Sequence, residues 1–299
     1  MKILVFGSFN IDKVYTLSHL PQKGETLYCG GYEVHVGGKG LNQALAFKKA
    51  GADVYAAGKV GADGDYLTDY LASGGVDVSL IDKSGEYTGH TIIEVDPDGQ
   101  NQMILFGGAN REITAEYCDK IIEENKDADL ILMQYETSCV EYMLRKAHEA
   151  KIPTALNPSP YVDEVKNLPY SLVDYLILNE YEGAQISGET DGEKIAKALY
   201  SMGCGSVILT LGSEGSIFYD GAQLAKASAF SVNAVDTTGA GDTFTGYCLY
   251  ALLSGEKPED ALAAASAASA IEVIKKGAAE TIPERQEVLE FMRIQGLSY

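Results

Sequence analysis

One short segment combines a carboxylate with residues that leave the backbone open. Residues 235–244 read VDTTGAGDTF, in which an extended run ends, a loop of small residues follows and a helix is expected to begin near Asp242. Gly239, Ala240 and Gly241 would leave backbone N–H groups uncovered at the helix N-terminus, where phosphate or developing negative charge can bind. The Asp242 carboxylate could accept a proton from a hydroxyl while these amides stabilise a transferring phosphoryl group. Taken alone, the segment fits an ordinary helix cap and turn equally well.

Two more glycine-rich segments offer donors and acceptors for hydroxyl groups. In residues 37–44, which read GGKGLNQA, Lys39 and Asn42 are three apart at an expected helix start and fall on one face. Just after the first expected strand, Asn10 and Asp12 alternate onto one side of an extended chain. Together these groups suit the vicinal hydroxyls of a sugar, although loop hydrogen bonding or helix capping would explain each segment alone.

Two common nucleotide-binding motifs fail on spacing. A P-loop requires G-x-x-x-x-G-K-[ST], but Lys39 is followed by Gly40, and Glu33 occupies the first glycine position. A dinucleotide fingerprint requires G-x-G-x-x-G, but Phe244 stands where the third glycine after Gly239 would belong. A nicotinamide-dependent dehydrogenase is therefore disfavoured.

Short apolar runs alternate with helical patterns over most of the chain. Runs that are apolar on both faces suit parallel strands covered on both sides by helices. They occupy residues 2–7, 53–60, 129–133, 153–156, 174–178 and 206–211. Helical patterns occupy residues 40–50, 66–73, 115–125, 140–150 and 193–202, with three more helices near the C-terminus. The alternation predicts a doubly wound, mostly parallel α/β sheet, with ligands bound at the carboxyl ends of its strands.

Two segments interrupt this alternation. Residues 13–36 and 86–106 lack helical periodicity and hold β-type runs at 26–29 and 91–95, with a hairpin turn at 96–99. We expect a small β-sheet, inserted in two pieces, that covers the pocket as a lid; ordinary edge hairpins are the alternative. The chain would then divide into this lid and an α/β core made of residues 1–12, 37–85 and 107–299.

The composition excludes several classes of protein. Lys and Arg number 23 against 43 Asp and Glu, and the net charge of −20 argues against nucleic-acid binding. No apolar run reaches the length of a membrane span, and the apolar part of the N-terminus is too short for a signal peptide. The five cysteines are scattered, without a C-x-x-C pair, which suits a reducing cytoplasm and not a disulfide framework or zinc site.

Taken together, these segments resemble the ribokinase-like (PfkB) family of carbohydrate and nucleoside kinases. Residues 37–44 are similar to the N-terminal signature of that family, and residues 236–244 are similar to its C-terminal signature. Shorter matches extend the resemblance over almost the whole chain, at residues 134–136, 156–158, 179–182, 210–215 and 275–278. The resemblance implies an ATP-dependent kinase with a doubly wound core and a β lid that often pairs across a homodimer.

The resemblance also implies a role for each matching residue. Asp242 would be the base that takes the proton of a sugar hydroxyl, and the amides of Gly239, Ala240 and Gly241 would form an anion hole. The residues implied to bind sugar hydroxyls are Asn10, Asp12, Gly38, Lys39, Asn42 and Glu136. Those implied on the ATP side are Asn179, Thr210, Gly212 and Ser213. Glu182 would organise Mg²⁺ through water.

Many members of the family bind a monovalent cation, usually K⁺, beside the anion hole. Asp236 and the carbonyl of Thr238 match one half of that site. The other half would come from backbone carbonyls within residues 272–281, with the candidates Glu272, Lys275, Gly277 and Thr281. In this sequence Glu280 stands where proline is usual in the family.

Within the family, the string at residues 37–44 is most similar to that of the members that phosphorylate ribose. This resemblance implies D-ribose, phosphorylated at O5, as the acceptor. Other acceptors stay open, namely 2-deoxyribose, fructose, tagatose or a nucleoside, as does a sensor that binds sugar or nucleotide without catalysis. Tyr135 is unusual beside Glu136; its ring would narrow the pocket or else point away into the core.

Overall fold

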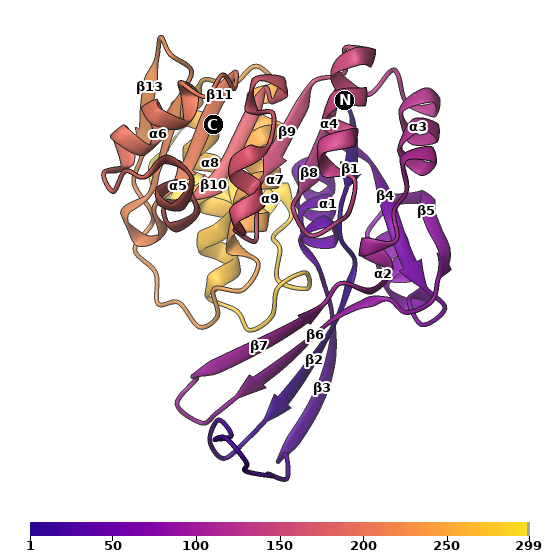
Figure 1. The fold of residues 1–299 in the computed structure, drawn as a ribbon. Coiled ribbons are helices and arrows are strands. Elements are labelled where there is room, and N and C mark those ends of the chain that lie inside the picture. Colours follow the sequence, from indigo (N-terminus) through magenta and orange to yellow (C-terminus); the bar gives the residue numbers. More distant parts are fainter. Residues whose placement is uncertain (298–299) are drawn as a thin grey trace.

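The computed structural model describes residues 1–297 and contains a nine-stranded main sheet (Figure 1). Its strands lie in the order β13-β12-β11-β10-β9-β8-β1-β4-β5. The seven from β11 to β5 are parallel, while β12 and β13 each run antiparallel to the neighbour before them. Their bounds are β1 Lys2–Phe6, β4 Asp53–Gly61, β5 Asp77–Gly85, β8 Leu130–Gln134, β9 Thr154–Asn157, β10 Tyr175–Asn179, β11 Ser206–Thr210, β12 Ser216–Tyr219 and β13 Leu224–Ala227.

Helices cover both faces of this sheet. One layer contains α1 (Lys39–Ala50), α2 (Asp65–Ser73), α7 (Ala240–Leu253), α8 (Pro258–Val273) and α9 (Arg285–Ile294). The other contains α3 (Ala115–Glu124), α4 (Val140–Ala150), α5 (Glu180–Ser187) and α6 (Gly192–Tyr200). Short 3₁₀ turns lie at η1 Gly108–Arg111, η2 Asp163–Asn167, η3 Tyr170–Leu172 and η4 Gly212–Glu214. No helix within residues 1–297 is both long and apolar enough to cross a membrane.

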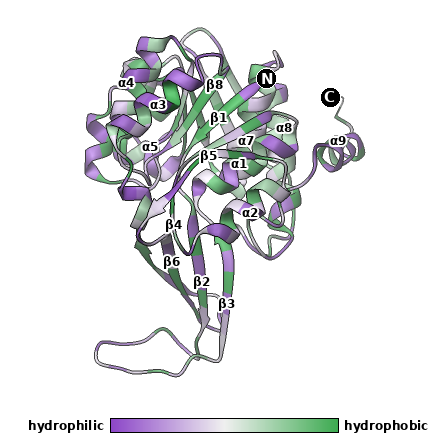
Figure 2. Cartoon of the chain, turned by 90° about the vertical axis from the view of Figure 1, so that its right-hand side faces the viewer, coloured by the Kyte–Doolittle hydropathy of each residue, from purple (hydrophilic) through white to green (hydrophobic). Residues whose placement is uncertain are grey.

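The alternation of side chains along β1 explains why two helical layers form. Ile3 and Val5 pack against the layer of α1 and α7, whereas Leu4 and Phe6 pack against the layer of α3 and α4. All four side chains are fully buried. Figure 2 shows β1 and the neighbouring β8 in the colour of hydrophobic residues. A strand apolar on both faces requires cover on both faces, so the predicted doubly wound fold is confirmed.

A second, four-stranded sheet projects from the main body (Figure 1). Its order is β3-β2-β6-β7, and the two central strands, β2 and β6, are parallel. Their bounds are β2 Asn10–Thr16, β3 Gly31–Gly37, β6 Gly89–Val95 and β7 Asn101–Phe106. The predicted small sheet in two chain segments is therefore confirmed.

Some details of the predicted strands were wrong. The run at residues 26–29 lies in the loop between β2 and β3, and Tyr28 is fully exposed. Strands β5, β12 and β13 were not foreseen. The latter two are only four residues each, too short to show a clear period.

The start of α1 lies directly against the end of β1. Gly38 has φ +95°, and a Cβ atom there would lie 2.7 Å from the carbonyl oxygen of Ser8 and 2.9 Å from the amide of Asn10. Only glycine fits this approach without strain. It places Lys39 and Asn42 beside the chain that leaves β1, at the carboxyl edge of the sheet.

Candidate active site

Asp242 lies in the first turn of α7 and is only 7% exposed. Its two carboxylate oxygens each accept one hydrogen bond from α1. Asn42 Nδ2 donates to Oδ2 at 2.9 Å, and Gln43 Nε2 donates to Oδ1 at 2.8 Å. These donors orient the carboxylate, while each oxygen keeps a further lone pair for an incoming proton.

Lys39 lines a small cavity of about 60 Å³ together with Asp242. Burial by itself lowers the pKa of the Lys39 ammonium. The carboxylates of Asp242, Glu136 and Glu182 outweigh that effect, so the pKa of this lysine is raised above its usual value. Lys39 therefore carries a positive charge next to the predicted base. The same cavity is also lined by Asn179, Glu182, Thr210 and Gly241.

The loop before α7 supplies two open amides, not three. Among the described residues, the amides of Gly239 and Gly241 have no acceptor, but that of Ala240 donates to the Thr237 carbonyl at 3.3 Å. The expectation that Ala240 also presents its amide needs this correction: the tight turn at 237–240 directs it inward. Two uncapped amides at the start of a fourteen-residue helix still form a site for negative charge.

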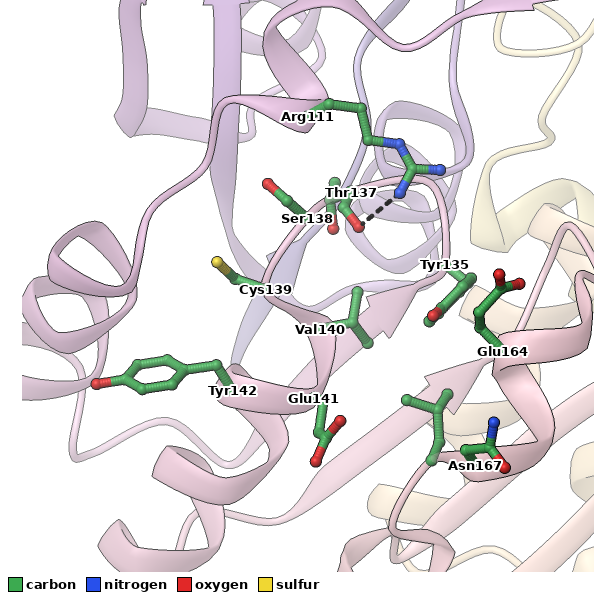
Figure 3. Close-up of a pocket in the computed structure, with 11 residues that line it drawn as sticks. Arg111, Tyr135, Thr137, Ser138, Cys139, Val140, Glu141, Tyr142, Glu164 and Asn167 are labelled. Atoms are coloured by element: carbon green, nitrogen blue, oxygen red, sulfur yellow. Dashed lines mark hydrogen bonds between the residues drawn. The ribbon is translucent and has the colours of Figure 1, made fainter.

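Asn10 and Glu136 meet in a cavity of about 170 Å³, also lined by Leu105, Gly107, Asn110 and Arg111. Asn110 Nδ2 donates to Asn10 Oδ1 at 2.8 Å, which orients the Asn10 amide. Glu136 accepts hydrogen bonds from the Ser8 hydroxyl and, at 3.4 Å, from the Lys39 amide. Tyr135 was expected either to narrow this pocket or to point away into the core; it packs against the core beneath α3 and α4 and also lines a neighbouring cavity (Figure 3).

Asp12 lines a larger, neighbouring cavity of about 610 Å³ between the small sheet and the core. Its walls come from β2, β3, β6 and β7 on one side and from residues 235–238 and 276–280 on the other. Burial raises the pKa of Asp12 to about 6, although a hydrogen bond with Thr91 opposes the shift; the Glu136 carboxylate adds to it.

A cavity of about 320 Å³ lies on the other side of Gly241. Thr210, Gly212 and Ser213 line it as expected from their place after β11, whereas Asn179 does not and opens into the small cavity beside Asp242. Most of its wall is apolar, and the sequence analysis missed these residues: Ala229, Phe230, Val232, Phe244, Ala270 and Val273. An apolar slot next to open amides suits a flat ring joined to a phosphate chain.

Asn179 and Glu182 cap helix α5 reciprocally. The Glu182 amide donates to Asn179 Oδ1 at 2.8 Å, and the Asn179 amide donates to Glu182 Oε2 at 3.2 Å. The other oxygen of Glu182 accepts a hydrogen bond from the Ser159 hydroxyl. Glu182, 6% exposed, is thus a rigidly held carboxylate whose direct hydrogen bonds are to the protein.

The loop around Asp236 gathers the predicted cation-binding residues. Thr238 and Gly277 donate their amides to the two Asp236 oxygens, at 3.0 and 3.1 Å. Partial burial raises the pKa of Asp236, but these bonds outweigh it and bring that pKa below its usual value. The carbonyls of Glu272 and Gly277 already accept bonds from the Lys275 amide and the Thr281 hydroxyl.

Glu272 differs from the expectation that it would act through its carbonyl. Its side chain is fully buried, and neither carboxylate oxygen has a hydrogen-bond partner among the described residues. Burial raises the pKa of Glu272 to about 8; the nearby Thr243 hydroxyl opposes this shift, and the Asp242 carboxylate adds to it. A Cβ atom on Gly239 would lie 2.7 Å from Oε1, so this carboxyl group sits directly behind the open amides.

A chain of polar side chains, which sequence reasoning missed, runs across the sheet edge from Gln134 to Glu182. Gln134 donates to Gln43 at 2.7 Å, Gln43 to Asn157 at 3.0 Å, and Asn157 to Ser159 at 3.0 Å. Ser159 then donates to Glu182. Gln43 and Asn157 lie inside recognised motifs, but only the fold shows that they contact each other.

Comparisons of the sequence and of the structure with known proteins all find carbohydrate kinases of one family. The model of the pfkB family carbohydrate kinases matches residues 1–285. Ribokinase of Haemophilus influenzae is 34% identical, over 97% of this chain and 98% of its own. The crystal structure of Thermotoga maritima ribokinase superposes with a TM-score of 0.88 at 34% identity, covering 97% of this chain and 99% of that one. Arabidopsis thaliana ribokinase, solved with ribose and ATP, gives 0.86 at 30% identity, with coverages of 97% and 98%.

The raised pKa of Asp12 predicts a pH-dependent stability. A carboxyl group whose pKa is about 6 in the folded state and 3.8 in the unfolded state destabilises the fold increasingly as pH rises through that interval. Asp12→Asn should therefore raise the free energy of unfolding above pH 6, by about 1–3 kcal/mol, and change it little below pH 4. Urea unfolding at several pH values measures this. Asp98→Asn, in the exposed turn at 96–99, is the control; parallel curves for wild type and Asp12→Asn would contradict the analysis.

Proposed function

The chain belongs to the pfkB family of carbohydrate kinases and is an ATP-dependent carbohydrate kinase; we propose that its acceptor is D-ribose, phosphorylated at O5. The observation that carries this proposal is the oriented carboxylate of Asp242 at the open start of α7, adjacent to the apolar cavity. Curated ribokinases at about one third identity over nearly the whole chain support ribose as the acceptor. A cytoplasmic location belongs to the proposal, since no disulfide links the cysteines of residues 1–297.

Asp242 acts as the base. The O5 hydroxyl gives its proton to the Asp242 carboxylate as O5 attacks the γ-phosphorus of ATP. The bond between O5 and phosphorus forms, the bond from phosphorus to the bridging β-oxygen breaks, and ADP leaves with that electron pair. Asn42 and Gln43 hold the carboxylate in a fixed orientation before this transfer.

The open amides of Gly239 and Gly241 stabilise the negative charge on the transferring group. Lys39 adds a full positive charge, since the surrounding carboxylates hold its pKa above the usual value. Because these groups are fixed by the start of α1 and the start of α7, they need little rearrangement during the reaction.

The sugar binds between the end of β1 and the start of α1 and under the small sheet. Its hydroxyls contact Asn10, Asp12, Gly38, Lys39, Asn42 and Glu136, which supply both donors and acceptors. Residues 13–36 and 86–106 act as a lid that closes over the sugar and excludes water from the phosphoryl group. The apolar cavity beside Phe230 takes the adenine ring, with Asn179, Thr210, Gly212 and Ser213 at its phosphate end.

Mg²⁺ and a monovalent cation, K⁺, complete the proposal. Glu182 fits Mg²⁺ held through water, because the protein already occupies both of its oxygens yet the carboxylate stays in the cavity beside Asp242. Mg²⁺ neutralises charge on the phosphates of ATP. For K⁺, the donors would be Asp236 and oxygen atoms of Thr238, Glu272, Lys275, Gly277 and Thr281. The unpartnered carboxylate of Glu272 fits a buried cation, which would offset its charge.

ADP release tests the acceptor. Ribose, 2-deoxyribose, fructose, tagatose, adenosine and cytidine are compared with no acceptor, in Mg²⁺-ATP and K⁺. We expect ribose to give the highest kcat/KM; 2-deoxyribose is the second candidate, since a Salmonella typhi deoxyribokinase is 30% identical over 98% of this chain. Asp242→Asn should lower kcat by about 10²–10⁴-fold while ribose binding persists in calorimetry. The exposed Asp53→Asn is the control, and wild-type turnover in Asp242→Asn would exclude the proposed base.

Cation binding is tested by melting temperature. A ligand that binds only the folded state raises its stability, so K⁺ should raise the melting temperature of the protein above that in Tris chloride of equal ionic strength. Asp236→Asn should remove most of the difference, because it removes the charged oxygens that Thr238 and Gly277 orient. Asp69→Asn, exposed on α2, should keep it. Identical melting curves in both salts would refute a K⁺ site.

We further propose a homodimer formed through the small sheet. Strand β7 is an edge strand with its Met103, Ile104, Leu105 and Phe106 side chains 45–60% exposed. Apolar edges of this kind pair with another strand or sheet. Sedimentation at micromolar concentration should show a dimer, and Ile104→Lys should yield a monomer. Ile294→Lys, which changes an isoleucine of similar exposure on α9, should stay dimeric; a monomeric wild type would refute the interface.

A further inference from the structure

One face of the small sheet carries charged side chains beside the proposed sugar site. Asp12 of β2 and Glu33 and His35 of β3 all line the cavity of about 610 Å³ between this sheet and the core. In the strand register, Asp12 lies directly opposite His35 on one side and opposite Thr91, on β6, on the other. Directly opposite residues point to the same face of a sheet, so Asp12, His35 and Thr91 form a row across it.

His35 is held by carboxylates from both sides of this cavity. Its Nε2 lies 3.1 Å from Glu33 Oε2, on the same strand, and its Nδ1 lies 3.8 Å from Glu280 Oε1, in the loop after α8. Only a doubly protonated ring can donate from both nitrogens, so this pair of carboxylates favours a charged imidazole. Lys276 of the same loop forms a second ion pair with Glu33, at 3.5 Å. The cluster thus fixes a positive ring opposite Asp12 and links the small sheet to the core.

The ionisation of Asp12 depends on several elements of the fold. Burial raises its pKa to about 6, and a hydrogen bond with Thr91 opposes this shift. The titratable groups around Asp12 and its cavity are His35 and Glu33 on β3, Lys276 and Glu280 after α8, Tyr66 on α2, Glu136 after β8 and Asp236 before α7.

The charge of His35 counters the acidic surroundings of Asp12. The carboxylates of Glu136 and Glu280 raise the pKa of Asp12 further, whereas His35 lowers it. The charge state of Asp12 matters for a sugar because an ionised carboxylate accepts hydrogen bonds at both oxygens. Such bonds to a charged acceptor are also stronger than those to a neutral one.

We propose that His35 is a positioning residue for the sugar: its charged ring, held opposite Asp12 by Glu33 and Glu280, keeps the Asp12 carboxylate ionised to accept hydrogen bonds from the sugar. This inference rests on the proposed contact between Asp12 and the sugar hydroxyls. His35 then influences sugar affinity only at pH values where Asp12 is partly protonated, whereas a histidine with a merely structural role would influence it at every pH.

The pH dependence of ribose binding tests this role. Calorimetric titration of the whole protein with ribose, at constant K⁺ and Mg²⁺, gives Kd from about pH 5 to about pH 8. Wild-type affinity should fall as pH falls through about 6, because Asp12 takes up a proton. His35→Gln should move the midpoint of this fall up by roughly half a pH unit. Ribose Kd should then rise about two-fold at about pH 6 and change little at about pH 8, with kcat unchanged.

Two further variants separate charge from structure. His35→Lys keeps a positive charge over the whole pH range and should keep the midpoint at or below that of the wild type. His19→Gln is the matched control, since His19 pairs with Glu25 at 2.9 Å in the loop between β2 and β3. Its profile should match that of the wild type.

Carboxyl-carbon NMR of the ligand-free protein measures the same titration without sugar. Asp12→Asn identifies the signal of Asp12, and His35→Gln should raise the midpoint of that signal as it raises the midpoint of ribose binding. If the wild type bound no ribose, the proposed acceptor would be refuted and the NMR titration would still decide the role of His35. An Asp12 midpoint that His35→Gln leaves unchanged, or a loss of ribose affinity that is equal at all pH values, would overturn the inference.

Discussion

The hydrogen bonds from the side-chain amides of Asn42 and Gln43, on α1, to the Asp242 carboxylate are the constraint on which the site depends. They join two helices that are about 200 residues apart in the chain, and they require them to pack closely. Gly246, one turn along α7, permits this: a Cβ atom there would lie 2.5 Å from the Cβ of Ala46 and 2.8 Å from the amide of Phe47. The packing of the helix pair therefore sets the direction of the Asp242 carboxylate, the proposed base. The open amides and Lys39 are placed with it because they lie at the same two helix starts.

A buried polar network beside the base must be satisfied or it destabilises the fold. Gln43 is the junction: its Nε2 donates to both Asp242 and Asn157, while its Oε1 accepts from Gln134. An apolar residue in its place would leave two or three buried groups without partners, at roughly 1–3 kcal/mol each. The same side chain thus contributes both to stability and to the orientation of the base. The unpaired buried groups within residues 1–297 include Asn42 Oδ1 and the carboxylate of Glu272, at positions proposed to be functional, but also the Ser216 hydroxyl on β12.

Much of this arrangement could be predicted from sequence, because the informative signals are local. The glycine-rich segments, the place of Asp242 at a helix start and the alternation of apolar strands all depend on neighbours within a few residues. The contacts of Gln43 with Asn157 could not be predicted, since they depend on which face of α1 meets the sheet. The inward turn of the Ala240 amide and the loop at residues 26–29 were misjudged for a similar reason: composition does not reveal which backbone groups already have partners.

The way the small sheet is attached has a mechanical consequence. Strand β2 begins at Asn10 and β3 ends at Gly37, directly before Gly38. Two residues proposed to contact the sugar, Asn10 and Gly38, therefore lie where the small sheet joins the core. A rotation of a few degrees at this junction would displace the far end of the sheet much more than its base. Conversely, a displacement imposed at the far end would rotate the residues at the junction. Whatever holds the far end of the sheet, including a second copy of the chain, biases the angle at which these residues meet the sugar. Dimerisation through this sheet, as proposed above, would therefore couple subunit association to substrate affinity.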